Sequence, residues 1–422
     1  MSNPFFDHPI LNSPYECPPR HWELDEDGQP TQKILDSRRR AKFITPIPKP
    51  KKRKGAAKQE GFVFDDGKGL STKEQQYDPT SIINEVRGHV DSWRSLPNPN
   101  QWQVTPETAR LLQHWRHHKF SGVRPFFCQV EAVETAIWLT EVAPLSKHGK
   151  RVLDLLAAAN RDANPELMRF ALRLATGAGK TTVMAMLIAW QTINAVRRPT
   201  SKHFTRGFLI CAPGLTIKDR LRVLQPNDPD SYYQDRELLP GDMLDDMSRA
   251  KIVIANYHVF KKRQRIEPSK GGGQLLQGRT GDALDTEETE GQMLQRVMPD
   301  LMGLKNILVI NDEAHHCYRV KPKDAEEEDL KGDEKKETEK DIDRFLDDLM
   351  FQLGSEDWEN LKFQIGISSS PVAASNSKDR NSSQSVMSSN GCAFEITDCD
   401  LWFARWQTRT STRKNIPTAE YA

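Results

Sequence analysis

The chain has 422 residues, enough for two or three domains, and its 60 basic residues nearly balance its 59 acidic residues. Overall charge therefore does not indicate a nucleic-acid partner, which has to be argued from local patches. Hydrophobic residues make up 37% of the chain, which is enough for a lean core. The six cysteines show no C-x-x-C spacing, which argues against a zinc site or a disulfide framework.

The sequence shows no sign of a membrane protein. Residues 1–9 lack the basic region followed by an apolar region that marks a signal peptide. No apolar run approaches the length that spans a membrane. We therefore expect a soluble, cytoplasmic protein with no membrane partner.

Residues 1–100 are expected to form a largely irregular arm with helices, because prolines recur and apolar periodicity is weak. Two basic runs lie in this arm, at residues 38–40 and 49–54. They either contact a phosphate backbone or are solvated charge runs in a linker. No aromatic residues interleave with them, so both interpretations stay open.

Regular structure is expected to begin near Trp102. The sequence Thr-Pro-Glu from Thr105 is typical of an N-cap followed by proline at the first helical position, and predicts a helix through Trp115. Three histidines fall on neighbouring positions of this helix, without a carboxylate or cysteine beside them. They favour a solvated face over a metal site: His114, His117 and His118.

A second helical run, residues 130–142, is preceded by Arg-Pro-Phe-Phe-Cys-Gln, which ends at Gln129. A glutamine amide can both donate to and accept from an adenine ring, so its position upstream of a glycine-rich turn favours adenine recognition. A glutamine at a helix start is also commonplace, and the two interpretations stay open. Another helical segment, residues 151–160, leads to the strand before the turn.

The sequence from Leu172 to Thr182 has the order that a phosphate-binding loop requires: an apolar strand, a glycine-rich turn, Lys-Thr, and a helix-forming run at residues 182–195. Backbone N–H groups of such a turn can point at phosphate oxygens, and the helix N-terminus adds partial positive charge. We expect Lys180 to reach the β- and γ-phosphates and Thr181 to ligate Mg²⁺. The predicted nucleotide-binding residues are Thr176, Gly177, Ala178, Gly179, Lys180, Thr181, Thr182 and Gln129.

One position departs from the general pattern G-x-x-x-x-G-K-[ST]. Leu174 stands where that pattern has its first glycine. Taken alone, the stretch is therefore also compatible with a strand-to-helix turn that binds no ligand.

Three continuous apolar runs, at residues 207–212, 252–256 and 307–311, alternate with helical segments after the loop. Runs of this length that contain β-branched residues read as buried strands of a parallel sheet. The predicted fold is an α/β domain with a doubly wound parallel sheet, which binds its ligand at the carboxyl ends of the strands.

Asp312 and Glu313 come directly after the third of these runs. Nucleotide hydrolysis needs two carboxylates here for different tasks. We expect Asp312 to hold Mg²⁺ and Glu313 to orient and deprotonate the attacking water, with Lys180 as the third catalytic residue. An acidic strand-to-loop corner is ordinary in isolation, but its combination with the glycine-rich turn points to an ATP site.

Residues 175–181 and the sequence Asp-Glu-Ala-His from Asp312 resemble motifs I and II of superfamily-2 DEAD/DEAH-box helicase-type ATPases. That family tolerates a non-glycine residue at the position of Leu174. Residues 212–216 resemble motif Ia and residues 256–258 resemble the Ib region, both of which touch a nucleic-acid backbone in the family. Gln129 matches its upstream glutamine motif.

More narrowly, the chain resembles the restriction (Res) subunit of type III restriction–modification systems, from its N-terminus to about Lys340. This resemblance implies a RecA-like domain that binds ATP and Mg²⁺, double-stranded DNA as a partner, and a modification (methyltransferase) subunit that reads the recognition site. In that family, cleavage belongs to a separate nuclease domain. The stretches that carry the resemblance are residues 3–6, 101–106, 124–127 and 311–318.

The sequence after residue 318 departs from the family pattern. Residues 324–339 are strongly acidic, as is typical of a solvated segment. The family continues with a strand that ends in Ser-Ala-Thr-Pro, whereas residues 368–371 read Ser-Ser-Ser-Pro. We favour a serine-rich loop here over a degenerate motif III. An insertion at residues 261–290, rich in glycine and charge, either covers the nucleic-acid side or is decoration.

The sequence divides into an irregular arm (1–100), a helical lead-in with a RecA-like ATP-binding domain (101–320), and an acidic, then serine-rich tail (321–422). About a hundred residues follow Glu313, fewer than the roughly 150 of an ordinary second domain. We therefore hypothesise a poorly ordered tail and a chain truncated after its first lobe, with its reading frame lost after about Lys340.

The leading functional hypothesis is the helicase/translocase-type ATPase domain of a type III-like restriction endonuclease subunit, an ATP-dependent hydrolase that interacts with DNA. The alternative is a non-catalytic truncated fragment that binds nucleotide or DNA without turnover. A small-molecule P-loop kinase is disfavoured, because Glu-Ala-His follows Asp312 and no lid arginine cluster is evident.

Overall fold

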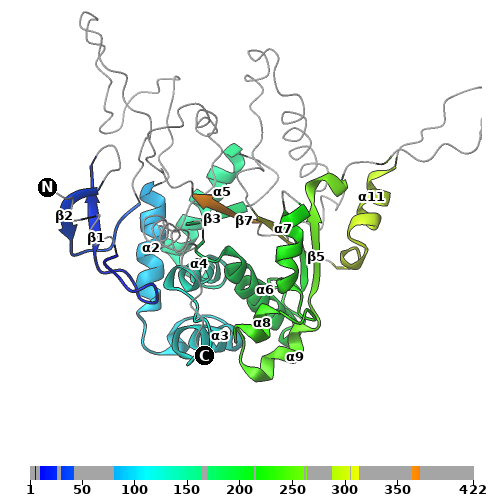
Figure 1. Ribbon diagram of the computed structural model, residues 1–422, viewed down its shortest axis with the longest axis horizontal. Helices are drawn as coiled ribbons and strands as arrows, with labels where there is room; N and C mark the ends of the chain where they lie inside the picture. The colour runs from blue at the N-terminus through cyan, green and yellow to red at the C-terminus, as the bar shows by residue number, and fades with distance from the viewer. Residues whose placement is uncertain are drawn as a thin grey trace, which may run out of the picture.

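The computed structural model describes residues 5, 10–25, 30–41, 80–163, 169–175, 177–212, 215–260, 263, 288–304, 306–312 and 364–370. Within them, a five-stranded sheet and the helices around it form a mixed α/β body, and a two-stranded sheet lies near the N-terminus (Figure 1). Throughout these ranges, no helix has both the length and the apolar character needed to cross a membrane.

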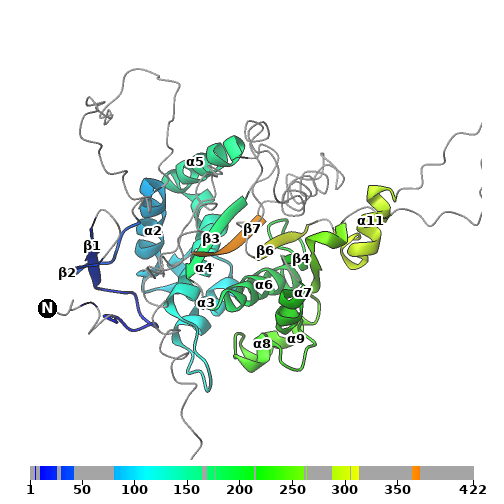
Figure 2. The same cartoon turned by 45° about the horizontal axis from the view of Figure 1, so that its top comes forward.

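The five-stranded sheet has the order β3-β7-β6-β4-β5, and every neighbouring pair is parallel (Figure 2). The prediction of a parallel sheet is therefore confirmed, and the four strands expected from apolar runs agree with the structure to within a few residues. Strand β4 is buried along its whole length, as expected of a strand inside a parallel sheet. The bounds are β3 (Arg169–Ala175), β4 (Gly207–Ala212), β5 (Lys251–Asn256), β6 (Leu308–Asp312) and β7 (Gln364–Ser370).

Residues 364–370 form a strand, β7, where the sequence favoured a loop. Residues 364–370 do not form the serine-rich loop that we favoured, because they pair with β3 on one side and with β6 on the other. In this register Ser369 lies opposite Leu174, and Ile365 lies opposite Ile310. The serine content suggested a loop, but pairing with two strands distant in sequence overrides local composition. The remainder of the predicted tail lies outside the described residues.

Alternate residues of the sheet belong to two separate cores. Phe208 and Ile210 of β4 join the larger core, to which the central helices contribute, whereas Leu209 and Cys211 join a smaller core with residues of α11 (Glu290–Val297). This alternation follows from the period of two along a strand. Apolar side chains therefore cover the sheet on both faces.

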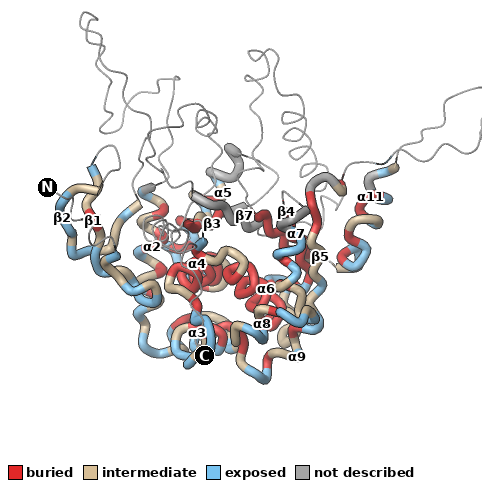
Figure 3. The backbone as a smooth tube through the Cα atoms, in the orientation of Figure 1, coloured by how far each residue is buried: buried red, intermediate tan, exposed pale blue. Residues whose placement is uncertain are grey.

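The helix after the glycine-rich turn, α6 (Lys180–Arg197), is the centre of the larger core. Its residues 182–194 are all buried, so it is enclosed by protein all round (Figure 3). It packs against α3 (Pro106–His117), α4 (Phe127–Ile137), α8 (Tyr232–Asp235) and α9 (Leu244–Met247). The other α-helices of the described residues are α2 (Thr80–Arg94), α5 (Lys147–Ala163), α7 (Leu215–Arg220) and α11.

The predicted start of α3 is confirmed. The Thr105 side chain accepts a hydrogen bond from the Thr108 backbone N–H at 3.1 Å, and proline occupies the first turn. The helical run predicted at residues 130–142 is also present, as α4 followed by a π-helical turn, Trp138–Val142.

The N-terminal region contains more regular structure than we expected. A hairpin of β1 (His21–Leu24) and β2 (Pro30–Leu35) was missed, and α2 begins well before Trp102. Both strands are short and mostly part-exposed, so they lack the apolar alternation that marks a strand in sequence. Trp22 is buried and lies edge-on to Phe5, with 5.7 Å between ring centroids.

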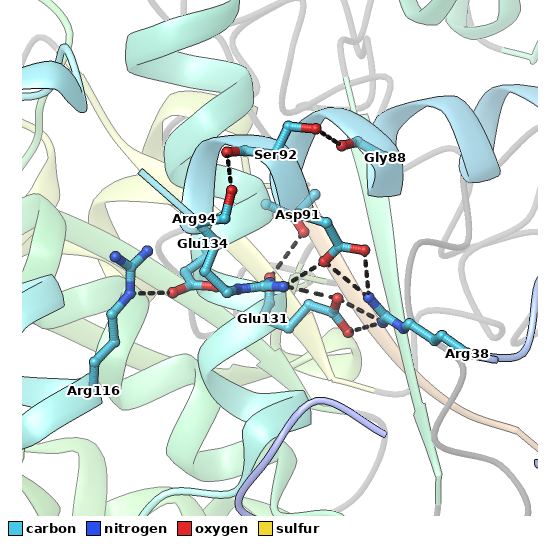
Figure 4. A network of polar contacts seen from close by, with 10 residues as sticks. Arg38, Gly88, Asp91, Ser92, Arg94, Arg116, Glu131 and Glu134 are labelled. Carbon is cyan, nitrogen blue, oxygen red and sulfur yellow. Dashed lines mark hydrogen bonds and ion pairs between the residues drawn. The ribbon is translucent and has the colours of Figure 1, made fainter. Parts of the chain in front are cut away.

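An ionic cluster joins this N-terminal region to the helical core (Figure 4). Two buried carboxylates of α4, Glu131 and Glu134, pair with arginines of three different segments. Arg38 lies 2.6 Å from Glu131, Arg94 of α2 lies 2.5 Å from Glu134, and Arg116 of α3 lies 2.7 Å from Glu134. Burial opposes the charge of Arg94, but its two glutamate partners hold its pKa above the ordinary value.

Arg38 therefore fits neither interpretation of the basic run at residues 38–40. It is neither a solvated charge nor positioned for a phosphate backbone, because Glu131 and Asp91 engage its guanidinium. The second basic run, residues 49–54, lies outside the described residues, as do the acidic run at 324–339 and most of the insertion at 261–290.

We expect Glu134→Ala to lower the free energy of unfolding by about 3–5 kcal/mol, because it removes a buried carboxylate that pairs with two part-buried arginines. Urea unfolding of the full chain measures this loss. The control is Asp36→Asn in the exposed Arg20–Asp36 pair, which should change stability by less than about 1 kcal/mol. Equal losses in the two variants would contradict a central role for the cluster.

Candidate functional site

The glycine-rich turn lies between the carboxyl end of β3 and the start of α6. Gly177 (φ 84°) and Gly179 (φ 81°) both have left-handed backbone conformations, which favour glycine because it has no Cβ. Gly179 is the N-cap of α6, so Lys180 is the first residue of the helix. This is the backbone shape that a phosphate-binding loop requires.

Gln129 braces the turn from α4. Its side-chain amide donates from Nε2 to the Ala178 carbonyl oxygen at 2.7 Å, and its Oε1 accepts from the Phe126 backbone N–H at 2.9 Å. The side chain is buried, and a Cβ built on Gly179 would lie 2.3 Å from Nε2. Recognition of adenine by Gln129 stays a prediction. The contact with the loop was not anticipated, because the sequence spacing carries no sign of it.

Lys180 and Asp312, predicted from motifs far apart in the chain, lie together. The Lys180 Nζ atom is 3.8 Å from Asp312 Oδ1, and both side chains are largely buried, with exposed fractions of 15% and 10%. They converge because β3 and β6 are parallel, so both strands end at the same edge of the sheet. Strand β7 separates the two strands and sets the spacing.

Some of the remaining predicted residues are described by the structure and others are not. Ala178 and Thr182 are buried, Gly177 is exposed, and Thr181 is half-buried in the first turn of α6. Thr176 and Glu313 lie outside the described residues. One neighbour was not predicted: Arg236 donates from Nη1 to the Thr182 Oγ1 atom at 3.1 Å. No motif surrounds Arg236 in the sequence, so only the fold reveals it.

The donor set fits Mg²⁺ and phosphate. Mg²⁺ prefers oxygen ligands and commonly takes only one or two from protein, and Asp312 and Thr181 offer a carboxylate and a hydroxyl. The described ranges contain no group of three or more histidine, cysteine or acidic side chains that could hold a metal.

The solvated face expected at the three histidines is present in part, because His117 and His118 are exposed whereas His114 is half-buried. His114 and His118 stack on each other, with ring centroids 4.3 Å apart, and both contact Glu237. Burial lowers the pKa of His114. His117 alone has the predicted exposed position without such a contact.

Four features together define a P-loop type of protein. They are a parallel α/β sheet, a turn with two left-handed glycines, a helix that begins at a lysine, and an aspartate at the end of a second strand. The model of a family described as "Type III restriction enzyme, res subunit" matches residues 123–345, more than half of the chain. The chain belongs to this family. Comparisons with curated proteins and with solved structures find no match.

The family match confirms the resemblance over the P-loop, the parallel strands β3 to β6 and Asp312. It does not cover residues 1–122, so the N-terminal stretches that we likened to the family remain predictions. Strand β7 lies beyond the matched residues.

We expect Gly179→Ala to impair ligand binding and to destabilise the protein by about 1–3 kcal/mol. Its backbone is left-handed, and its new Cβ would collide with Gln129. Thermal unfolding and ATP titration measure the two effects. The control Gly88→Ala lies in α2 with open space around the new methyl group, and should keep both properties at or above the wild-type level. Equal behaviour of the two variants would argue against a constrained loop.

Proposed function

We propose that this chain contains a RecA-like P-loop domain with a doubly wound sheet, which binds ATP and Mg²⁺ and acts as the helicase/translocase-type ATPase domain of a type III-like restriction subunit. The observation that carries the proposal is the distance of 3.8 Å between Lys180 Nζ and Asp312 Oδ1, where Lys180 directly follows the glycine turn. Membership of the restriction-subunit family supports it.

In this proposal the backbone N–H groups of Gly177, Gly179 and Lys180 bind phosphate oxygens, and the Lys180 ammonium neutralises charge on the β- and γ-phosphates. Thr181 and Asp312 hold Mg²⁺, which when bound compensates the negative charge of the phosphates. The Lys180 contact positions the Asp312 carboxylate for this role. Glu313 is the proposed base that orients and deprotonates the attacking water.

We propose that Ser368–Ser370 are a degenerate form of the family's motif III. The position of β7, between the strand that leads to the P-loop and the strand that ends at Asp312, supports this assignment. Its backbone adjoins both halves of the site. Strand β7 would therefore link hydrolysis to events at the DNA.

Double-stranded DNA is the proposed partner, together with a modification (methyltransferase) subunit. The stretches that resemble motifs Ia and Ib lie at the carboxyl ends of β4 and β5, the sheet edge on which the P-loop also lies. This common edge supports coupling between nucleotide and nucleic acid. A DNA-directed ATPase of this kind would work in the cytoplasm.

We expect Lys180→Ala to abolish measurable ATP binding, because it removes the positive charge aimed at the phosphates. Isothermal titration calorimetry with Mg²⁺ and ATP measures the loss. Lys150→Ala removes an exposed lysine of α5 and serves as the control. Unaltered affinity in the Lys180 variant would sink the proposed ATP site.

Phosphate release separates a motor from a binder. We expect double-stranded DNA to raise the rate of phosphate release, and Glu313→Gln to lower it by about 100-fold or more through loss of the base. The Glu313 variant should still bind ATP. Tight ATP binding without turnover in the unaltered chain would instead favour the alternative, a non-catalytic protein that binds nucleotide or DNA.

A further inference from the structure

Arg236 reaches the first turn of the P-loop helix from a different part of the chain. It directly follows α8, and its Nη1 donates to Thr182 Oγ1 at 3.1 Å. The guanidinium lies 3.8 Å from the centroid of the Tyr232 ring, and its Nη2 donates to the Tyr232 hydroxyl at 3.0 Å. The ring contact and the two hydrogen bonds fix the orientation of a long side chain that would otherwise sample many rotamers.

The segment that carries Arg236 is clamped to α3. Glu237 has a left-handed backbone (φ 49°), a conformation that is unfavourable for a non-glycine residue and persists only where neighbours enforce it. Its backbone carbonyl contacts His114 Nε2 at 2.7 Å, and its carboxylate accepts from Ser121 and contacts His118. The next carbonyl, of Leu238, accepts from Trp115 Nε1 at 2.8 Å. These contacts hold the backbone on the C-terminal side of Arg236.

Arg236 differs in its charge environment from the described arginines that form ion pairs. Those arginines lie beside carboxylates, whereas within the described ranges no carboxylate lies at ion-pair distance from Arg236. It also lies at the N-terminus of α6, where the helix dipole disfavours a cation. Neither an ion pair nor the dipole of α6 therefore accounts for the position of the Arg236 side chain. Its hydrogen bond with Thr182 needs another explanation.

Thr182 links Arg236 to the turn. Its backbone N–H donates to the Gly179 carbonyl at 2.9 Å, and its Oγ1 lies 3.6 Å from the Cβ position of Gly179. The Gln129 amide fills the space where a Cβ of residue 179 would lie, and it donates to the Ala178 carbonyl. Gln129 of α4 therefore contacts the backbone of the turn, and Arg236, just after α8, contacts the Thr182 side chain in the first turn of α6.

We propose that Arg236 is a positioning residue of the ATP site. It holds the Thr182 hydroxyl and thereby the turn from which Lys180 and Thr181 reach the phosphates. The inference rests on the proposed ATP site and deepens it. It also assigns a role to the segment from Tyr232 to Leu238, which contains no motif recognisable in the sequence.

The test is a double-mutant cycle on the full chain, with Mg²⁺–ATP affinity measured by calorimetry. We expect Arg236→Gln and Thr182→Val each to weaken binding about tenfold, which corresponds to about 1.4 kcal/mol. The double variant should be no weaker than either single variant, because both remove the same contact. Thr182→Ser keeps the hydroxyl that Arg236 contacts and should therefore bind more tightly than Thr182→Val. Arg110→Gln, in an exposed pair with Asp242, is the control and should also be unchanged.

Two outcomes would overturn the proposal: an affinity of Arg236→Gln within twofold of the wild type, or a double variant weakened about a hundredfold, as two independent effects would give. If Arg236→Gln does not fold, the Thr182→Val and Thr182→Ser pair decides, and equal affinities of these two would overturn it. The Lys180→Ala variant separates the hypotheses. Lost binding there, with Arg236→Gln unchanged, refutes only the role of Arg236, whereas retained binding refutes the ATP site itself.

Discussion

The contact between the Gln129 amide and the glycine turn is the constraint on which the site depends. One side-chain amide caps the start of α4 and, 2.7 Å away, holds the Ala178 carbonyl. Because the amide fills the space beside Gly179, only a residue without a Cβ fits there. The conformation of the loop thus follows from helix packing as well as from the glycines. A displacement of α4 along its axis would reach the turn through this buried side chain.

The ionic cluster explains why α4 stays in place. Two carboxylates on one helix are buried, and burial of a charge is tolerated only when counter-charges and hydrogen bonds accompany it. The counter-charges come from Arg38, Arg94 and Arg116, on three separate segments. Those segments are therefore not interchangeable decoration around the core. If one of these segments left the core, a buried glutamate of α4 would lose one of its counter-charges. This dependence couples the N-terminal region to the helical core.

Elements that a short stretch of sequence specifies, such as an apolar run or a glycine turn, were predictable. Contacts between residues distant in the sequence were mostly not predictable without a motif. The strands β4, β5 and β6 and the helix after the turn followed from apolar runs and glycines, and so did the approach of Lys180 to Asp312 at a common sheet edge. Strand β7 was misjudged because serine content is local, whereas its pairing depends on β3 and β6. Arg38 and Arg236 were beyond sequence reasoning, since each finds its partners on elements that only the fold brings near.

The position of β7 between β3 and β6 also bears on how the protein is made. During synthesis the P-loop strand leaves the ribosome first, and the strand that ends at Asp312 follows well over a hundred residues later. Strand β6 can pair with β4 at that stage, but β3 cannot join the sheet until residues 364–370 have emerged, because β7 lies between β3 and β6. Parallel pairing over such sequence distances forms slowly. The glycine turn is therefore synthesised well before the strand that joins it to Asp312.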